Sequence, residues 1–358
     1  MADRTDIEWT DATWNPVTGC SVVDAGCTNC YAMALAGTRL RDHPSRAGLT
    51  RLSAGRPKWT GEVRFNAQWL EQPLTWRQPR RIFVCAHGDL FHPSVPDEWI
   101  DKVFAVMALA PRHLFQVLTR RPKRARTWLE RRDDRGRHPP LDHAALMAAT
   151  GRVKSPALDL RRWPLPHVWL GTSAHDQASA NLRIPELLDC PAAMHFVSLE
   201  PLLGPIDLMN LALPPKGGFA QRMDALRGLT GTCSSASLYE DGIIAHRIQS
   251  SLGLVIVGGE SGARARPMHP DWVRMLRNQC QQAGVPFFFK QWGEWAPPEI
   301  MTWDDPPQMR LQQRIHSGET GLMHVFQDGT QAGRIGKKAA GRLLDGRIWD
   351  QMPEAYHG

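Results

Sequence analysis

Residues 7–31, IEWTDATWNPVTGCSVVDAGCTNCY, hold the pattern that indicates the fold, because an apolar run is followed by a polar loop and then by the start of a helix. We expect Ile7–Trp14 to form the first strand and the helix to begin near Tyr31. The same succession of strand and helix recurs along the chain. This alternation is typical of an α/β barrel or an open parallel sheet.

The later strand candidates are short, nearly continuous apolar runs, as expected for strands that are buried on both faces of a parallel sheet. They are Arg81–Cys85, His113–Leu118, His167–Gly171, Met194–Leu199, Leu254–Val257 and Pro286–Phe289. Helices are expected between them, at Glu98–Ala110, Arg121–Arg132, Asp176–Asp189 and Pro270–Ala283.

Polar or charged residues follow each of these runs. In barrels and in open parallel sheets, the active site lies at the carboxyl ends of the strands. The sequence therefore predicts a site built from strand ends, which include Asp89, Ser173, Glu200, Glu260 and Lys290.

Cys20, Cys27 and Cys30 form a C-x6-C-x2-C cluster in the loop after the first strand. Structural zinc normally takes four protein ligands, whereas a metal that takes part in chemistry keeps one position open. An iron–sulfur cluster held by three cysteines would have such an open iron. A zinc site completed by a distant histidine, His87 or His92, is the chief alternative, and thiols without a metal are the third.

The composition of the chain limits the classes of protein to consider. A chain of 358 residues with 42% hydrophobic residues can bury a full core without disulfides, and its seven cysteines do not form a disulfide framework. The N-terminus lacks the apolar stretch of a signal peptide, and no later window approaches the ~20 apolar residues of a membrane span. We expect a soluble protein of the reducing cytoplasm with no membrane partner.

The positive charge of the chain is not evenly spread. The formal net charge is +7, and Arg120–Arg137 holds nine basic residues against three acidic ones. Such a run can follow a phosphate backbone, and the 14 tryptophans include rings that could stack on bases. We therefore predict a nucleic-acid partner, bound by Arg120, Arg121, Lys123 and Arg124. A solvated helix face followed by a charged loop is the alternative.

Most of the chain resembles a known family. The segments that carry the resemblance are IEWTDATWNPVTGCSVVDAGCTNCYA (7–32), PRRIFVCAHGDLFHPSVPDEWI (79–100), VWLGTS (168–173), SLEPLLGPI (198–206), VIVGGESG (255–262), FFFKQWGEW (287–295) and KKAAGRLLDGRIWDQMP (337–353). They are similar to an uncharacterised, phage-associated family with a three-cysteine motif. The cysteine loop after the first strand also resembles that of the radical S-adenosylmethionine (radical SAM) superfamily.

This second resemblance implies a partial (β/α) TIM-like barrel and a 4Fe-4S cluster held by Cys20, Cys27 and Cys30. It also implies that S-adenosylmethionine chelates the fourth iron and is cleaved, with an electron from a separate donor, to a 5′-deoxyadenosyl radical that abstracts hydrogen from a substrate. The first cysteine gap is longer than the gap most frequent in that superfamily. Gly258-Gly259-Glu260 also follows a later strand than the equivalent motif there.

The resemblance and the strand-end positions together predict the other site residues. Glu200, Glu260 and Lys290 are expected to be catalytic. Cofactor binding is expected from Asp89, His92, Ser173, Glu200, Gly258, Gly259 and Glu260. The structural alternatives are an Asp turn for Asp89 and His92, a helix cap for Ser173, a turn cap for Glu200, a tight turn for Gly258-Gly259 and packing for Lys290.

Residues 1–296 are expected to form the barrel, with residues 204–253 as an insertion too long for an ordinary connection. Residues 297–358 are expected to be an appendage packed on it. Two function classes stay open besides the radical SAM enzyme. One is a zinc-stabilised protein that binds nucleic acid or a protein partner, such as one encoded nearby, without catalysis. The other is a divalent-metal-dependent nuclease or hydrolase built on Asp89, Glu200 and Glu260.

Overall fold

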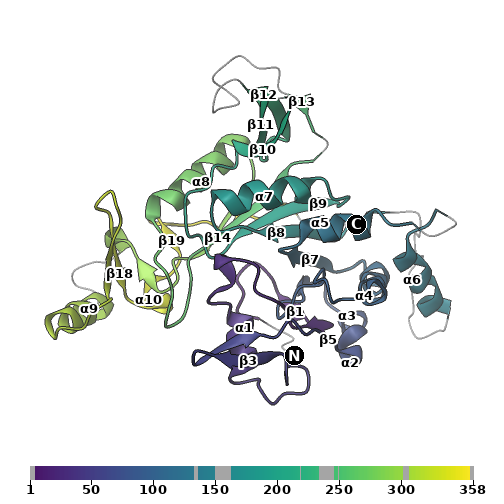
Figure 1. Cartoon of the computed structure of the whole chain (residues 1–358), viewed down its shortest axis with the longest axis horizontal. Coiled ribbons are helices and arrows are strands. Elements are labelled where there is room, and N and C mark those ends of the chain that lie inside the picture. Colours follow the sequence, from purple (N-terminus) through teal and green to yellow (C-terminus); the bar gives the residue numbers. More distant parts are fainter. Residues whose placement is uncertain are drawn as a thin grey trace. The chain divides into compact units, whose positions relative to one another are not determined.

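Seven strands form one sheet in a mixed α/β fold, which the computed structural model describes for residues 5–132, 136–149, 163–217, 219–233, 246–248, 250–300 and 306–354 (Figure 1). In order across the sheet they are β1 (Ala12–Trp14), β6 (Arg81–Val84), β7 (Leu114–Thr119), β8 (Val168–Ser173), β9 (Met194–Leu199), β14 (Leu252–Gly258) and β15 (Phe287–Gln291). The pairs β1–β6, β6–β7, β7–β8 and β14–β15 are parallel. Because the strands follow one another in chain order, the sheet is compatible with the predicted partial β/α barrel.

The strands lie where the apolar runs predict them, with differences at their ends. β9 has the predicted bounds, whereas the first strand is shorter than the predicted Ile7–Trp14. Its pairing begins at Ala12, opposite Ile82. The preceding residues form turns, in which the Thr10 N–H donates to the Ile7 carbonyl over 3.2 Å.

Helices follow the strands, and four of them lie close to the predicted ranges: α4 (Asp97–Leu109), α5 (Pro122–Leu129), α7 (Gln177–Leu188) and α8 (Pro270–Ala283). Two further helices, α6 (Pro139–Ala149) and α9 (Pro306–His316), were not predicted. Local signals fix the bounds of α8, because His269 caps its first turn and Gly284 ends it at φ 69°. Within the described ranges, no helix is long and apolar enough to cross a membrane.

The chain divides into two compact units. The first unit is Met1–Thr172, Glu186–Phe196 and Glu354–Gly358, and the second is Ser173–Pro185 and Val197–Pro353. This division falls at other positions than the predicted boundary between residues 296 and 297.

The core of the first unit is rich in aromatic rings. Trp9 packs on Phe83 with 4.8 Å between ring centroids, and Trp14 packs on Phe115 at 5.8 Å. Both tryptophans are buried, so they are core residues and not exposed platforms for bases. The smaller elements of this unit are β2 (Val17–Thr18), η1 (Ala25–Cys27), α1 (Tyr31–Gly37), β3 (Thr50–Ser53), β4 (Arg56–Trp59), β5 (Arg64–Phe65), α2 (Ala67–Leu70) and α3 (Gln72–Thr75).

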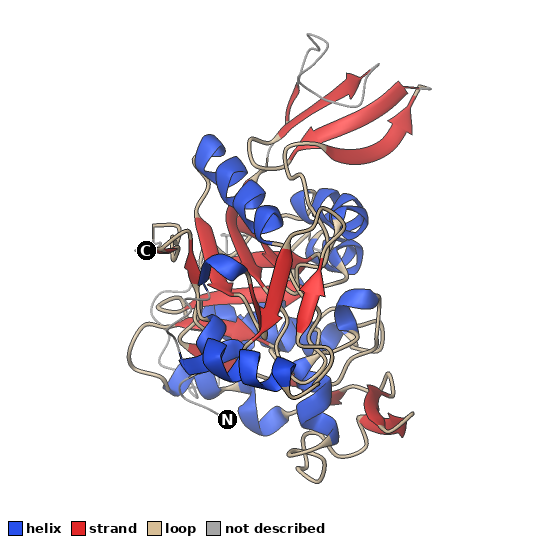
Figure 2. Ribbon diagram, turned by 90° about the vertical axis from the view of Figure 1, so that its left-hand side faces the viewer, coloured by secondary structure: helices blue, strands red, loops and turns tan. Residues whose placement is uncertain are grey.

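The second unit contains the predicted insertion and the predicted appendage. In the insertion, β10 (Leu211–Lys216), β11 (Phe219–Asp224), β12 (Leu229–Cys233) and β13 (His246–Arg247) form an antiparallel sheet of their own (Figure 2). Residues 218, 234–245 and 249 of the insertion lie outside the described residues. The other small elements are β16 (Trp295–Ala296), η2 (Pro298–Ile300), β17 (Met323–Val325), β18 (Gln331–Arg334), α10 (Lys337–Ala340), β19 (Leu343–Leu344) and β20 (Arg347–Ile348). The appendage reaches β15, where the Phe289 N–H donates to the Trp349 carbonyl over 2.8 Å.

Buried histidines predict that stability falls in mild acid. Burial lowers the pKa of His113 to about 4, so the folded chain keeps it neutral while the unfolded chain protonates it near pH 6.5. The stabilising contribution is present above pH 6.5 and is lost as the pH falls toward 4, amounting to about 2 kcal/mol between pH 7 and pH 5. Urea unfolding at both pH values measures this loss. A His113→Gln variant should lose about 2 kcal/mol less, and an equal loss in both proteins would contradict the assignment.

Candidate metal centre

The cysteine loop is ordered by short hydrogen-bonded turns. The Asp24 carboxylate accepts the Gly26 N–H over 2.8 Å and so caps η1, which ends at Cys27. The Cys30 N–H donates to the Cys27 carbonyl over 3.3 Å, and α1 begins at the next residue. The turns therefore fix the backbone spacing of the last two cysteines before any ligand binds.

Cys20 and Cys30 are half-buried. Both pack against a small core formed by Ala32, Met33, Ala36, Leu49 and Trp59. Burial raises the pKa of Cys20 to about 12 and also raises the pKa of Cys30. Binding a cation at these sulfurs would therefore displace protons from both thiols.

One arginine connects the cysteine loop to the strand ends. Arg121 Nη1 lies 3.7 Å from Cys20 Sγ and 2.7 Å from Asp89 Oδ2, while Nη2 donates to Ser21 Oγ over 2.8 Å. The Arg121 and Asp89 side chains are 12% and 5% exposed, so this ion pair is buried. A charge-assisted donor at sulfur stabilises a thiolate, which is the form of cysteine that binds metals.

Asp89 is the centre of this network. Besides Arg121, its carboxylate accepts hydrogen bonds from Thr119 Oγ1 at 2.7 Å, the Phe91 N–H at 3.0 Å and the Arg120 N–H at 3.1 Å. Asp89 follows β6 after a short turn, and its oxygens are occupied by donors of the same unit. Its predicted contact with a cofactor therefore stays a prediction.

His92 also reaches the cysteine loop, because its Nε2 lies 2.9 Å from Ser21 Oγ. Arg120 Nη1 donates to Asp24 Oδ1 over 3.0 Å. Sequence analysis did not single out Ser21 or Asp24. Asp24 had a usable signal, since an Asp two residues before a glycine is typical of an Asx turn.

The spacing of the sulfurs separates two kinds of metal. Among the described residues, His269, Asp271 and Asp328 have ligand atoms that all lie within 4.8 Å of one another, and the three cysteines do not form such a group. Three thiolates on one tetrahedral zinc would lie about 3.8 Å apart, given Zn–S bonds of about 2.3 Å. In an iron–sulfur cluster each cysteine binds a different iron, so wider separations fit.

The group formed by His269, Asp271 and Asp328 is explained by the start of α8. His269 Nδ1 accepts the Asp271 N–H over 3.1 Å, and Nε2 lies 3.0 Å from Asp328 Oδ2. The Asp271 carboxylate pairs with Arg274 at 2.9 Å. Both ring nitrogens are thus engaged, and we assign the group to helix capping.

In the second unit, Glu200 and Lys290 form an ion pair. Lys290 Nζ lies 3.1 Å from Glu200 Oε1, and Ser198 Oγ donates to Oε2 over 3.2 Å. Glu200 comes directly after β9 and Lys290 lies in β15. Both side chains are partly exposed, at 16% and 19%, so this pair can meet a ligand that carries both charges.

Glu260 is neutralised within the second unit. Its carboxylate accepts hydrogen bonds from the Arg266 N–H, Nε and Nη2 at 2.8, 2.9 and 2.6 Å. The Glu260 side chain is 6% exposed. The sequence did not point to Arg266. Its N–H groups occupy the carboxylate oxygens of Glu260 that the predicted catalytic and cofactor-binding role would need.

Ser173 ends β8 and is buried, and its carbonyl accepts Arg183 Nη1 over 2.9 Å. It does not cap the next helix, because the Ser179 N–H in the first turn of α7 donates to Asp176 Oδ1 over 2.8 Å. The helix-cap alternative for Ser173 is therefore wrong, and its predicted contact with a cofactor stays a prediction.

Gly258 and Gly259 are required by close contacts and not by the dihedral angles of a tight turn, because neither has a positive φ. A Cβ on Gly259 would lie 1.8 Å from the Trp292 carbonyl oxygen, and one on Gly258 would lie 2.6 Å from Glu200 Oε1. At 259 the contact is with backbone, so only glycine lets the two segments approach, whereas at 258 the contact is with the end of the Glu200 side chain.

A Gly259→Ala variant is therefore expected to lose more than about 2 kcal/mol of unfolding free energy, since backbone must move to admit the methyl group. Gly204→Ala is the control, because its Cβ would meet Asp176 Cβ at an ordinary 3.4 Å. Urea denaturation compares the two. If both variants have the same unfolding free energy, the backbone around 259 accommodates the added methyl group and the expected loss is wrong.

A family model described as "Protein of unknown function (DUF5131)" matches residues 4–353. The chain belongs to the DUF5131 family. No curated protein and no solved structure matches it. Because the description of DUF5131 assigns no activity, the resemblance to radical SAM enzymes and the phage association stay predictions.

The basic run of this DUF5131 chain is largely paired with carboxylates of the first unit. Three of the four predicted nucleic-acid ligands make such pairs, and Lys123 is exposed. The pairs of the run include Arg120–Asp24 (3.0 Å), Arg121–Asp89 (2.7 Å), Arg124–Asp97 (2.6 Å), Arg126–Asp189 (2.8 Å), Arg131–Asp97 (2.8 Å), Arg131–Asp101 and Arg137–Asp142 (2.7 Å). Residues 133–135 lie outside the described residues. The run thus offers fewer free charges to phosphate than its composition suggests.

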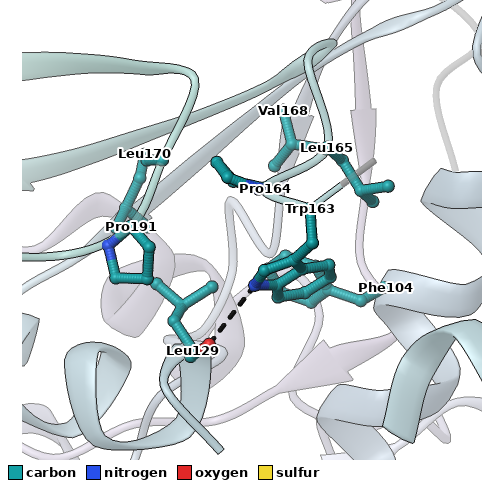
Figure 3. A pocket seen from close by; sticks show the side chains of 9 residues that line it. Phe104, Leu129, Trp163, Pro164, Leu165, Val168, Leu170 and Pro191 are labelled. Atoms are coloured by element: carbon teal, nitrogen blue, oxygen red, sulfur yellow. Dashed lines mark hydrogen bonds between the residues drawn. The ribbon is translucent and has the colours of Figure 1, made fainter. Parts of the chain in front are cut away.

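A small pocket in the first unit of the DUF5131 chain is apolar (Figure 3). Trp163 and Phe104 lie together on one side of it, and the Trp163 indole N–H donates to the Leu129 carbonyl over 3.3 Å. Its nine lining residues include no titratable side chain, so it offers no acid, base or metal ligand.

Proposed function

We propose that the protein is an iron–sulfur enzyme of the radical SAM type, in which Cys20, Cys27 and Cys30 hold a 4Fe-4S cluster and S-adenosylmethionine is the cosubstrate. The observation that carries the proposal is the loop of three half-buried thiols, which is approached by a buried arginine. When bound, such a cluster supplies the electron that cleaves the sulfonium.

The residues of the first unit would prepare the ligands. The turns at Asp24 and Cys27 set the loop, and the small core packs against Cys20 and Cys30. Arg121 offers its N–H to Cys20 and is held by Asp89. Hydrogen bonds to cysteine sulfur and burial are among the features that tune the potential of an iron–sulfur cluster.

The ion pair of the second unit suits a zwitterion. Glu200 can accept hydrogen bonds from an ammonium group, and Lys290 can bind a carboxylate. An amino-acid ligand of this unit would carry both groups. The glycines Gly258 and Gly259 keep the backbone beside Glu200 free of side chains.

The hydrolase alternative is less well supported. It requires carboxylates that are free to bind a divalent cation, yet Asp89, Glu200 and Glu260 each face a cationic side chain of their own unit. The zinc alternative needs a fourth ligand, for which His92 at the cysteine loop is the candidate, and a closer approach of the three sulfurs than the structure shows. Nucleic acid remains our proposed substrate class, and an electron donor is required.

Release of 5′-deoxyadenosine tests the proposal. The protein is reconstituted anaerobically with iron and sulfide, reduced with dithionite and incubated with S-adenosylmethionine, and the products are separated by chromatography. We expect 5′-deoxyadenosine in amounts that depend on iron loading. Stoichiometric zinc, no iron uptake and no cleavage would instead support the zinc alternative.

A further inference from the structure

The hairpin of β3 and β4 carries a row of cations on one face. The strands pair antiparallel, with Arg51 opposite Lys58 and Ser53 opposite Arg56. Ala54 and Gly55 form the two-residue turn, both with positive φ, which suits the twist of a hairpin. Because side chains alternate between the two faces of a strand, Arg51, Ser53, Arg56 and Lys58 share one face.

The opposite face of the hairpin is fixed against α1, beside which it lies in Figure 1. Trp59 belongs to the core of this helix, and its N–H lies 3.3 Å from Met33 Sδ. Gly37 makes room for Pro57, whose Cβ would lie 2.2 Å from a Cβ on the glycine. This packing leaves the cationic face outward, with Arg51 and Arg56 exposed and Lys58 half-buried.

The chain around these cations is poor in acids. Residues 31–62 hold six basic residues and two acidic ones, Glu62 and Asp42, and Asp42 pairs with Arg41. Within the described ranges, no carboxylate makes an ion pair with Arg51, Arg56 or Lys58. Like charges directly opposite each other destabilise a strand pair. The repulsion between these cations lowers the stability of the free chain, and a bound polyanion would relieve it.

We propose that this outer face of the β3–β4 hairpin binds the phosphate backbone of a nucleic acid. A two-stranded ribbon is narrow enough to enter a major groove, and arginine pairs with phosphate through two N–H groups. A lipid surface is disfavoured, because membrane-binding segments present several apolar side chains beside their cations, whereas the large exposed apolar side chain of this hairpin, Leu52, lies on the opposite face. The hairpin, and not the basic run that begins at Arg120, then holds the backbone.

The same small core joins the hairpin to the candidate metal centre. Trp59 of β4 packs in the cluster against which Cys20 and Cys30 lie. A nucleic acid on the outer face would therefore be bound by the substructure that carries the cysteine loop. The claim that this face binds the substrate rests on the proposed function. Binding of nucleic acid to the face can be measured without a cluster.

The test is binding of a fluorescently labelled 30-base-pair duplex, and of the matching single strands of DNA and RNA, by the full chain between 50 and 200 mM NaCl. We expect a linear fall of log K with log[salt] for at least one of these probes, with a slope of about −2 to −3 because three cations meet phosphates. Combined Arg51→Glu, Arg56→Glu and Lys58→Glu should lower the affinity at 50 mM NaCl at least about 10-fold. Changing all three to Gln removes their charges without adding acids, so the magnitude of the slope should fall by about 2 to 3. Circular dichroism checks that both variants fold.

The control reverses Arg77, Lys216 and Lys338 to Glu, which changes the net charge equally at three exposed positions elsewhere. It should reduce affinity no more than about 3-fold. Equal losses in both variants, no salt-dependent binding, or loss only of binding to phosphatidylserine vesicles would overturn the proposal. Cleavage of S-adenosylmethionine without nucleic-acid binding would overturn this inference alone, and binding without cleavage would overturn the proposed function alone.

Discussion

Replacing Cys27 with serine is expected to abolish iron uptake and 5′-deoxyadenosine formation. A serine hydroxyl stays protonated where a thiolate must bind, so a cluster would keep two cysteine ligands. Changes in residues that merely support metal ligands cost about 10- to 100-fold, and loss of a ligand should exceed 100-fold. Iron per chain and cleavage per chain are the measurements.

Cys190→Ser is the matched control, because Cys190 lies outside the loop. Its Sγ is 3.5 Å from the Pro122 carbonyl and 3.3 Å from the Glu186 carbonyl, and a serine hydroxyl can donate to the same acceptors. This variant should load iron as the parent does. A Cys27→Ser protein that still binds iron and cleaves S-adenosylmethionine would remove the loop from the proposed mechanism.

The second large effect is expected from Asp89→Ala. It leaves the buried Arg121 guanidinium without its carboxylate, and breaking a buried pair in this way costs about 3–5 kcal/mol. It also releases Arg121 from the position in which it reaches Cys20 and Ser21. Urea unfolding should show the loss of stability, and iron loading should fall with it.

Asp97→Ala is the control for burial. Asp97 pairs with Arg124 and Arg131, but its side chain is 38% exposed against 5% for Asp89. An exposed pair contributes about 0–1 kcal/mol, so this variant should stay close to the parent. Similar losses of unfolding free energy in both variants would show that the buried Asp89–Arg121 pair stabilises the fold no more than an exposed pair does.

The order of strands and helices could be predicted from the sequence because the strands of the parallel sheet are buried apolar runs. β9 and α8 have the predicted bounds. The first strand was predicted too long, since apolar character alone does not reveal where a neighbouring strand ends its pairing. The two-unit division depends on contacts between distant segments and leaves no local mark in the sequence.

The charges of the candidate site could be predicted only in part. Asp89, Glu200 and Lys290 lie near strand ends as expected. Their ionic partners lie in other segments of the chain, since Asp89 pairs with Arg121 and Glu200 pairs with Lys290. Arg121 and Asp89 are far apart in the sequence, so a basic run could be counted but its pairing could not be foreseen. The β3–β4 hairpin was missed, although Ala54-Gly55 between alternating residues is a usable turn signal.

Electron paramagnetic resonance of the reconstituted, reduced protein tests the central proposal most directly. The account predicts a 4Fe-4S signal that changes when S-adenosylmethionine is added, because an open iron is available to it, and that is absent from Cys27→Ser. A protein that takes up stoichiometric zinc, or that shows an iron signal indifferent to S-adenosylmethionine, would contradict it.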